Sequence, residues 1–203
     1  MGITAQQFEQ LQKRLSGAKQ TATPVHESSY QHGNTNNHQV ILGVDPSLRG
    51  TGFGVIQLAQ PYPKTLVQGT IKCSPTWERS RCLVKTAQTL RETIKQYRPT
   101  VCVIEGLFFA QNLQTALIMG EARGAILMTL AEAGLDIYEI APRKMKQAIV
   151  GYGAAQKFAV GKMVQRMLHL AELPAPDAAD ALALALTFAQ ENGRISLSAP
   201  KKI

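Results

Sequence analysis

Three short apolar segments follow one another between residues 40 and 73, joined by short links rich in turn-forming residues. They cover residues 40–44, 52–56 and 66–73. An apolar run of this length between turn signals is typical of a buried strand. Strands connected so tightly pair in antiparallel fashion, because a parallel pair needs a long crossover. We therefore expect the fold to begin with a three-stranded antiparallel meander.

After the meander, the chain alternates between helical spacing and two more strands. One face of a helix that Pro99 closes carries the apolar residues Leu83, Ala87, Leu90, Ile94 and Tyr97. Residues 101–104 predict a fourth strand that ends at Glu105, and residues 137–140 predict a fifth. Further helices are expected over residues 113–133, 156–170 and 177–190.

This order of elements predicts an α/β fold with the ribonuclease H-like topology, a mixed five-stranded sheet flanked by helices. Right-handed helical crossovers would place strands four and five parallel to strand one. The last helix contains an alternation of Ala and Leu over residues 181–186. We assign it to a helix because both residues are strong helix formers and Ala is poor in strands. Unrelated activities share this topology, so the fold alone does not decide the function.

The folded domain is expected to cover residues 39–192, between a flexible N-terminal tail over residues 1–38 and a C-terminal tail over residues 193–203. Residues 20–38 are rich in Gln, Thr, Ser, Asn and His and contain few apolar residues, a composition typical of disordered chain. Before them, the spacing of a short amphipathic helix is seen in Phe8, Leu11 and Leu15.

The chain of 203 residues carries a surplus of positive charge. Lys and Arg number 22 against 14 Asp and Glu, a formal net charge of +8. Such a surplus favours a polyanionic partner, either nucleic acid or an acidic membrane surface. The apolar run over residues 115–131 is interrupted by Glu121 and Arg123, which argues against a membrane-spanning helix.

The compartment is indicated by the N-terminus and by the cysteines. The first ten residues contain no apolar signal-peptide core. The cysteines are odd in number and lack Cys-x-x-Cys spacing: Cys73, Cys82 and Cys102. This pattern argues against a disulfide framework or a thiolate zinc site and favours a reducing cytoplasm.

Four acidic residues are predicted to meet at one edge of the sheet. Asp45 and Glu105 end neighbouring parallel strands, and Asp177 and Asp180 are three residues apart on one helical face. Taken singly, Asp45 before Pro46 could be a turn former, Glu105 an exposed strand end and Asp177 a helix cap. Together with the predicted topology, they form a cluster of carboxylates.

Clustered carboxylates need compensation, because each pair repels by about 4 kcal/mol at about 4 Å and an effective dielectric constant of about 20. Oxygen ligands without His or Cys select hard cations such as Mg²⁺ or Mn²⁺. Two such ions can activate a water molecule and stabilise the leaving oxygen in a phosphodiester displacement. The residues therefore predict a metal-dependent nuclease site.

A run of cations without acidic residues precedes the Asp pair. Between residues 140 and 171 it contains Arg143, Lys144, Lys146, Lys157, Lys162 and Arg166. Most such runs are solvated helix faces, but the opposite charges usual on such a face are missing here, which favours contacts with phosphates. Phe108 and Phe109 follow Glu105; an adjacent aromatic pair is often core, although one member could stack on an exposed base.

The helix expected over residues 113–133 is apolar on more than one face. Gly120 and Gly124 allow close approach of another backbone, which could belong to the sheet or to a second copy of the chain. A two-fold dimer would present two equivalent sites to one substrate. We expect this helix to form a homodimer interface.

Several segments together resemble the RuvC family of Holliday-junction resolvases. They are residues 41–55, 105–110, 116–124, 146–153 with Lys157, and 177–183. Two positions depart from the family pattern: Ser47-Leu48 replaces Gly-Ser, and Gln156 stands where an acidic residue often precedes the lysine. Neither touches a proposed metal ligand, so the departures bear on sequence preference.

The resemblance implies a homodimeric endonuclease with two Mg²⁺ ions per site, for which Mn²⁺ substitutes, that makes paired symmetric nicks in four-way junctions during recombination and repair. It implies metal-ligand and catalytic roles for Asp45, Glu105, Asp177 and Asp180. It also implies that Lys146 and Lys157 act near the cleaved phosphate and that Phe108 stacks on unpaired bases. A branch-migration complex of the RuvA and RuvB kind is an implied partner.

Three other functions compete with this one. Asp45 with Gly50, Gly52 and Gly54 resembles the phosphate loop of actin-like ATPases and sugar kinases, but the chain offers no second loop or second similar domain. A non-cleaving junction-binding protein would lack some of the carboxylates or lysines. A nuclease for another branched DNA or for an RNA–DNA hybrid would use the same metal ligands.

Overall fold

The structure, a computed structural model, describes residues 38–106, 112–191 and 200–203. The expected N-terminal tail therefore lies outside the described residues except for His38, and only the last four residues of the expected C-terminal tail are described. Phe108 and Phe109 also lie outside them. The described residues all belong to one compact unit.

The predicted meander and its two parallel extensions are confirmed. Strands β1 (Val40–Asp45), β2 (Gly50–Gln57) and β3 (Lys64–Lys72) pair antiparallel in sequence order. Strand β4 (Val101–Glu105) lies parallel to β1, and β5 (Asp136–Ile140) lies parallel to β4. The fold is thus the mixed α/β arrangement that the order of elements indicated.

The sheet has six strands where the sequence predicted five. The additional strand, β6 (Lys201–Lys202), pairs antiparallel with β5 and places Lys202 opposite Tyr138. Two adjacent lysines carry no apolar signal, so the sequence pattern could not reveal this strand. Lys202 is held there by an ion pair of 2.6 Å with Asp136.

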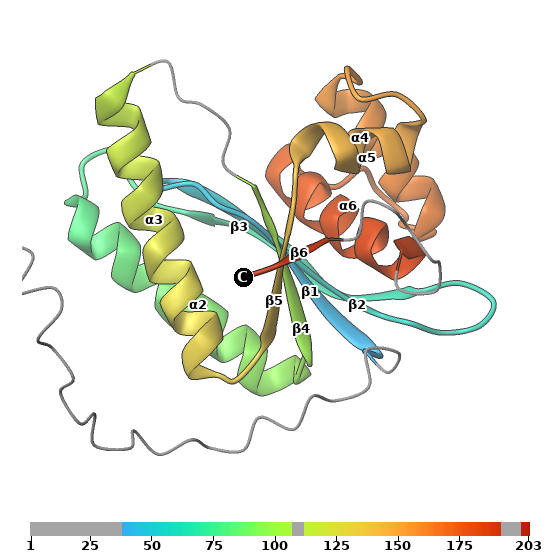
Figure 1. Cartoon of the computed structure of the whole chain (residues 1–203), viewed down its shortest axis with the longest axis horizontal. Coiled ribbons are helices and arrows are strands. Elements are labelled where there is room, and N and C mark those ends of the chain that lie inside the picture. Colours follow the sequence, from blue (N-terminus) through green and yellow to red (C-terminus); the bar gives the residue numbers. More distant parts are fainter. Residues whose placement is uncertain (1–37, 107–111, 192–199) are drawn as a thin grey trace, which may run out of the picture. The chain divides into compact units, whose positions relative to one another are not determined.

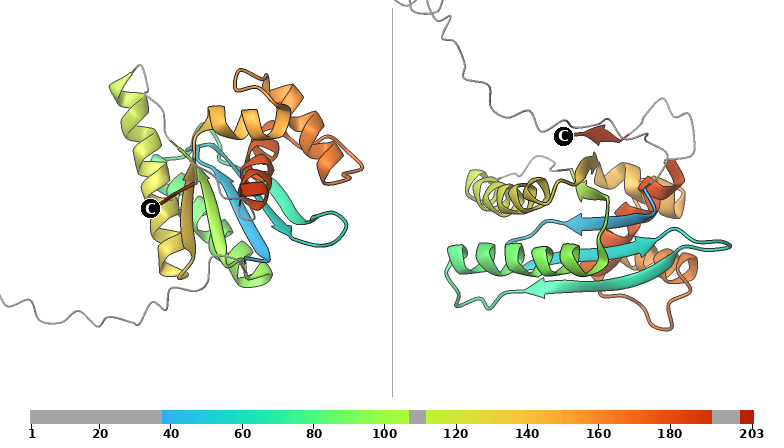
Figure 2. Two further views of the ribbon diagram at one scale, coloured as in Figure 1. Left: turned by 45° about the vertical axis from the view of Figure 1, so that its right-hand side comes forward. Right: turned by 90° about the horizontal axis from the view of Figure 1, so that it is seen from below.

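Helices cover both faces of the sheet (Figure 1). On one face lie α2 (Arg79–Tyr97) and α3 (Leu113–Glu132), and on the other lie α4 (Pro142–Val150), α5 (Lys157–Met167) and α6 (Pro176–Glu191). The same two layers are visible after a turn of the molecule (Figure 2). None of the helices in the described part of the chain is long and apolar enough to cross a membrane.

Helix α4 was missed by the sequence analysis. It begins with Pro142 at its first turn and ends at Gly151, which adopts a left-handed conformation with φ of 96°. Its buried residues, Met145 and Ile149, are four apart and form only one apolar ridge. Proline at the start and glycine just past the end are ordinary helix boundaries, and they were the available signal.

The strands alternate between the two layers, and this alternation sets the place of the site. Ile41 and Val103 belong to the core under α4, α5 and α6, whereas Leu42, Val44 and Ile104 belong to the core under α2 and α3. Successive side chains of a strand point to opposite faces. The last residues of β1 and β4, Asp45 and Glu105, therefore share the face that α6 covers.

Candidate active site

Asp45 and Glu105 form the centre of the site. In the parallel pair β1 and β4, Val44 lies opposite Ile104, so the two strands end side by side at the next residue. The side chains of Asp45 and Glu105 are hydrogen-bonded to each other. Two carboxyl groups make such a bond when they share a proton.

Glycines in the strands bring α6 onto the sheet beside this pair. A Cβ atom at Gly43 would overlap the carbonyl oxygen of Ala181, and one at Gly52 would overlap that of Asp177. Gly52 pairs with Asp45 across β1 and β2. The first turns of α6 therefore lie directly against the strand ends. Glycine at positions 43 and 52 therefore permits this close approach.

Asp180 and Asp177 enter the site from the first turns of α6. Asp180 is only 4% exposed, and its Oδ2 lies 3.0 Å from Nζ of Lys157. Its Oδ1 is buried and has no hydrogen-bond partner among the described residues. Asp177 directs Oδ2 toward Gly50, at 3.3 Å from the place that a Cβ atom would occupy. A buried carboxylate oxygen without a partner is costly, and it is a free ligand position.

Burial and mutual repulsion shift the ionisation of the site. Burial is the main cause that raises the pKa of Asp45 to about 8, and the charges of Glu105 and Asp180 raise it further, whereas Lys157 lowers it. Burial also raises the pKa of Glu105, against the opposing effects of its hydrogen bond with Asp45 and of Lys157 and Lys146. The cluster therefore retains a proton that a bound cation would displace.

Lys157 is the cation in direct contact with the cluster. It begins α5, and its side chain is 59% exposed while its ammonium group reaches Asp180. Burial lowers the pKa of Lys157, but the hydrogen bond to Asp180 and the charges of Asp180, Asp45 and Asp177 outweigh this effect and raise it. Lys157 thus faces both the carboxylates and solvent.

Of the other predicted cations, Lys146 lies near the site and Arg143 shares a cavity with it. The charge of Lys146 on α4 acts on Glu105. Lys146 and Arg143 line an open cavity of about 600 Å³ together with Gly153. A Cβ atom at Gly153 would overlap the side chain of Arg143, so this glycine leaves room for the arginine. Lys162 is exposed one helical turn beyond Phe158, with Nζ 5.7 Å from the centre of that ring.

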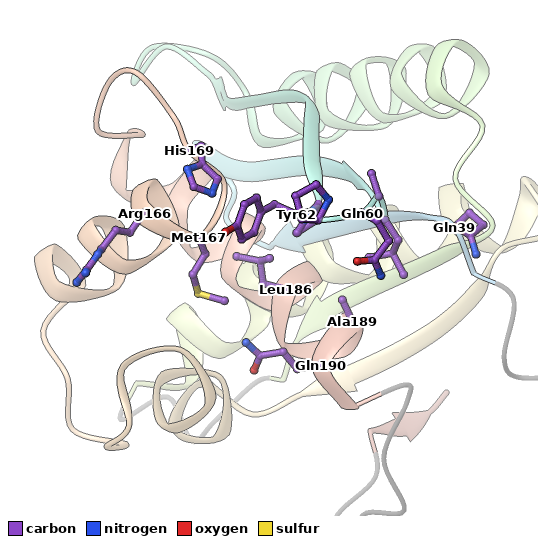
Figure 3. A pocket seen from close by; sticks show the side chains of 13 residues that line it. Gln39, Gln60, Tyr62, Arg166, Met167, His169, Leu186, Ala189 and Gln190 are labelled. Carbon is purple, nitrogen blue, oxygen red and sulfur yellow. The ribbon is translucent and has the colours of Figure 1, made fainter.

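Lys144 and Arg166 lie away from the carboxylates. Lys144 forms an ion pair of 2.8 Å with Glu191, the last residue of α6. Glu191 comes eleven residues after Asp180, which at about 1.5 Å per residue is about 16 Å along the helix axis. Arg166 lines a separate pocket of about 830 Å³ that Leu186, Ala189 and Gln190 from the last turns of α6 also line (Figure 3). The structure therefore does not bring these two cations to the site.

The residues fit a metal that is completed by its substrate. Among the described residues, no group of three or more His, Cys, Asp or Glu side chains is gathered closely enough to hold an ion by itself. Mg²⁺ in phosphoryl-transfer sites is commonly held by one or two carboxylates, water molecules and substrate phosphates, without a cage of protein ligands. The hydrogen-bonded pair and the unpartnered Oδ1 of Asp180 offer oxygen donors of this kind.

Comparison with known proteins identifies the family. Residues 41–188 match the family model described as "Crossover junction endodeoxyribonuclease RuvC". The chain is 42% identical over 148 residues to the protein of that name from Caldicellulosiruptor saccharolyticus, which covers 72% of this chain and 89% of the relative. It is also 42% identical over 151 residues to that from Heliobacterium modesticaldum, covering 74% and 93% of the two chains.

A solved structure supports the same assignment. The structure described as "T. thermophilus RuvC in complex with Holliday junction substrate" is similar with a TM-score of 0.73 and 32% sequence identity, and the match covers 82% of this chain and all of the other. This chain belongs to the RuvC family of crossover junction endodeoxyribonucleases.

Proposed function

We propose that this protein is a structure-selective endonuclease that resolves four-way DNA junctions by paired symmetric nicks in recombination and repair. The observation that carries the proposal is the cluster of Asp45, Glu105, Asp177 and Asp180 under α6, in a chain of the RuvC family. The comparison structure of Thermus thermophilus RuvC with a Holliday junction supports this substrate.

The cofactor we propose is Mg²⁺, two ions per site, with Mn²⁺ as a substitute. Asp45, Glu105, Asp177 and Asp180 would hold the ions, because all four supply hard oxygen donors. When bound, the metal supplies an activated water and stabilises the leaving oxygen of the phosphodiester. The unpartnered Oδ1 of Asp180 supports this assignment.

The chain's own residues prepare the site for that chemistry. Asp45 and Glu105 would lose the proton between them on binding a cation, because a metal ligand must be ionised. Lys157 holds Asp180 in place and keeps its exposed ammonium group ready for a phosphate oxygen. Lys146 adds positive charge on the side of Glu105. Both lysines are thus proposed to act on the cleaved phosphate.

Further DNA contacts are proposed at the rim of the site. Arg143 and Lys162 are proposed to meet backbone phosphates, because Arg143 shares a cavity with Lys146 and Lys162 lies on the same helix as Lys157. Contacts of this kind position the duplex and carry little sequence information. Phe108 would stack on unpaired bases at the junction centre.

A homodimer through α3 is proposed because this helix has an exposed stripe. Leu113, Leu117 and Met128 are 76%, 59% and 54% exposed. Gly120 and Gly124 lie on the same stripe, and a Cβ atom at either would meet nothing within 4 Å. The sheet is therefore not the surface that these glycines approach. We propose that the α3 helix of a second copy packs on this stripe. A RuvA–RuvB complex is a separate proposed partner.

The proposed compartment is the cytoplasm. Cys73, Cys82 and Cys102 are buried free thiols, a state that a reducing compartment preserves.

The function is tested by strand cleavage of a mobile four-way junction in Mg²⁺. A linear duplex of the same sequence and an Asp45→Asn variant run as controls. Paired nicks at symmetric positions on the junction alone, absent with the variant, are the expected result. Equal cutting of the linear duplex would remove junction selectivity and leave a general nuclease. Binding without cutting by the unaltered protein would contradict the enzymatic function.

A further inference from the structure

One buried arginine touches the site from the opposite layer of the fold. Arg123 lies on α3, which covers the other face of the sheet from α6, and it is only 8% exposed. Its guanidinium group donates one hydrogen bond to the backbone carbonyl oxygen of Glu105, at 2.5 Å. It forms an ion pair with the carboxylate of Glu139 through its other terminal nitrogen.

The partner carboxylate is placed by β5 and by a glycine. Glu139 lies on β5, where it is opposite Ile104 of β4. A Cβ atom at Gly106 would stand 3.2 to 3.4 Å from the Glu139 side chain, which is tighter than ordinary contact. Gly106 therefore leaves room for this carboxylate. The backbone N–H of Gly106 donates a hydrogen bond to the carbonyl oxygen of Ile140, at 2.9 Å.

These contacts fix the last residue of β4 on both sides of its peptide. In the described part of the chain, the register of β4 with β5 ends at Glu105, which lies opposite Ile140. Arg123 donates a hydrogen bond to the carbonyl of Glu105 at this strand end, and a buried carbonyl that lost its donor would be costly. The charge of Glu139 balances that of Arg123, so the guanidinium group is occupied and does not compete for the Glu105 carboxylate.

We propose that Arg123, held by Glu139, is a positioning residue that sets the main chain at Glu105 and thereby keeps the Glu105 carboxylate in register with Asp45 for metal binding. This inference rests on the proposed metal-dependent function. It assigns to α3 a second task besides the proposed dimer contact. A buried ion pair that served only folding would not be expected to change the affinity for metal.

The test compares two variants of this pair with a matched control. Arg123→Lys keeps the charge but cannot reach both acceptors, because a lysine ammonium group lacks the planar fork. Glu139→Gln keeps the size and leaves the guanidinium charge unbalanced beside Glu105. The control is Arg91→Gln, which breaks the ion pair of 2.9 Å between Arg91 and Glu132 on the exposed surface. Asp45→Asn serves as the reference for a lost ligand.

Mn²⁺ binding to the full-length protein in complex with a four-way junction that has a nuclease-resistant backbone, so that substrate phosphates can complete the site, is measured by calorimetry. The melting temperature is measured beside it. Junction affinity without divalent ions and the Mg²⁺ dependence of single-turnover cleavage are measured on the same proteins. We expect both variants to bind Mn²⁺ about 10–100-fold more weakly, the usual effect of removing a group that orients a metal ligand. Cleavage should recover at high Mg²⁺, with junction affinity unchanged, and Arg91→Gln should match the unaltered protein.

Lower melting temperature with unchanged Mn²⁺ affinity would overturn the proposal and leave Arg123 a folding residue. Failure of both variants to fold at 25 °C would overturn it as well, because the pair would then be a requirement of the fold. The proposed function fails separately: the unaltered protein would then bind Mn²⁺ and still not cut the junction.

Discussion

At the scale of single residues, folding favours the protonated form of Asp45, whereas metal binding needs its carboxylate form. Its pKa is raised from the ordinary 3.8 to about 8, mainly by burial and then by Glu105 and Asp180. The folded protein therefore holds a proton between about pH 4 and pH 8 that the unfolded chain has lost. The free energy of unfolding therefore falls as the pH rises through this range, because only the folded state binds the extra proton.

The first prediction follows from this loss of stability at higher pH. In EDTA, Asp45→Asn should unfold at higher denaturant concentration than the unaltered protein at pH 8, by about 1 kcal/mol or more, since one pKa unit corresponds to about 1.4 kcal/mol. At pH 4 the two proteins should be nearly equal, because Asp45 is then protonated in the folded state and half-protonated in the unfolded chain. Urea unfolding at both pH values checks it, and an equal difference at both would contradict it.

Two lysines on α5 should separate chemistry from binding. Lys157 reaches Asp180 at 3.0 Å, whereas Lys162 is exposed farther along the same helix. Lys157→Ala should slow single-turnover cleavage by about 100-fold or more, the scale of losing one group that stabilises transition-state charge. Junction affinity should change much less.

Lys162→Ala is the counterpart of that variant. It should leave single-turnover cleavage intact, weaken junction binding and reduce the slope of log affinity against log salt by about 1. Cleavage rates at saturating protein and binding isotherms at several salt concentrations decide between the two patterns. Loss of binding with Lys157→Ala, at an unchanged rate of cleavage, would reverse the assignment.

The places of three carboxylates could be predicted from the sequence because each stands at a boundary that the pattern marks, and that of Asp180 because it lies three residues after Asp177 in a helix. Asp45 and Glu105 end apolar runs, and Asp177 follows Pro176. The contacts of Lys144 and Arg166 could not be predicted, since a helical cation faces whichever element packs nearby. Arg123 had a signal that was not used: it shares the buried face of α3 with Ala122, Ile126 and Leu130.

At the scale of elements, the site depends on how closely α6 lies on β1 and β2. A Cβ atom at Gly52 would overlap the backbone of Asp177, which cannot rotate away. A Cβ atom at Gly54 would lie 2.6 Å from the side chain of Leu182. Gly52→Ala should therefore displace the first turn of α6, and Gly54→Ala should require only that a side chain repack. Both should cost about 1–3 kcal/mol of folding stability, as overpacked sites do.

Metal affinity distinguishes these two glycines. We expect Gly52→Ala to weaken Mn²⁺ binding at least about tenfold, because a shifted metal ligand acts like one that has lost its orienting group. Gly54→Ala should bind Mn²⁺ like the unaltered protein. Calorimetry on folded protein, at a temperature well below both melting transitions, makes the comparison. Equal Mn²⁺ affinity of the two variants would mean that the approach of α6 does not set the ligands.

The elements that were predicted correctly have strong and regular apolar patterns. The alternation over residues 181–186 illustrates the limit of periodicity, because Ala and Leu at every position are buried all round α6. Helix propensity decided that segment. Helix α4 shows the converse, since a single ridge of Met145 and Ile149 is too little to distinguish it from a loop. Strand β6 depends on pairing with β5 and has no pattern of its own.

At the scale of the whole molecule, the two layers are proposed to divide the work. The four carboxylates lie on the side of the sheet that α6 covers, with the cations proposed to contact DNA, and the α3 layer presents the exposed stripe of Leu113, Leu117 and Met128. Arg123 joins the layers through the end of β4. Paired nicks need two sites held at a fixed separation, which one chain cannot supply.

The dimer proposal is tested by a charge placed on the α3 stripe. Met128 on α3 and Val84 on α2 are both 54% exposed, so Val84→Glu is a matched control for Met128→Glu. A buried, unpaired carboxylate opposes association, and we expect Met128→Glu to sediment as a monomer at micromolar concentration. Val84→Glu should sediment like the unaltered protein.

The products of a supercoiled plasmid that extrudes a cruciform then show what the dimer does. Two coordinated nicks at one junction linearise the plasmid, whereas a single nick relaxes it to an open circle. The unaltered protein and Val84→Glu should give linear product, and Met128→Glu should give open circles, because each site remains intact in a monomer. A Met128→Glu protein that stays dimeric, or a monomeric one that still linearises the plasmid, would contradict the proposal that paired cutting depends on the α3 interface.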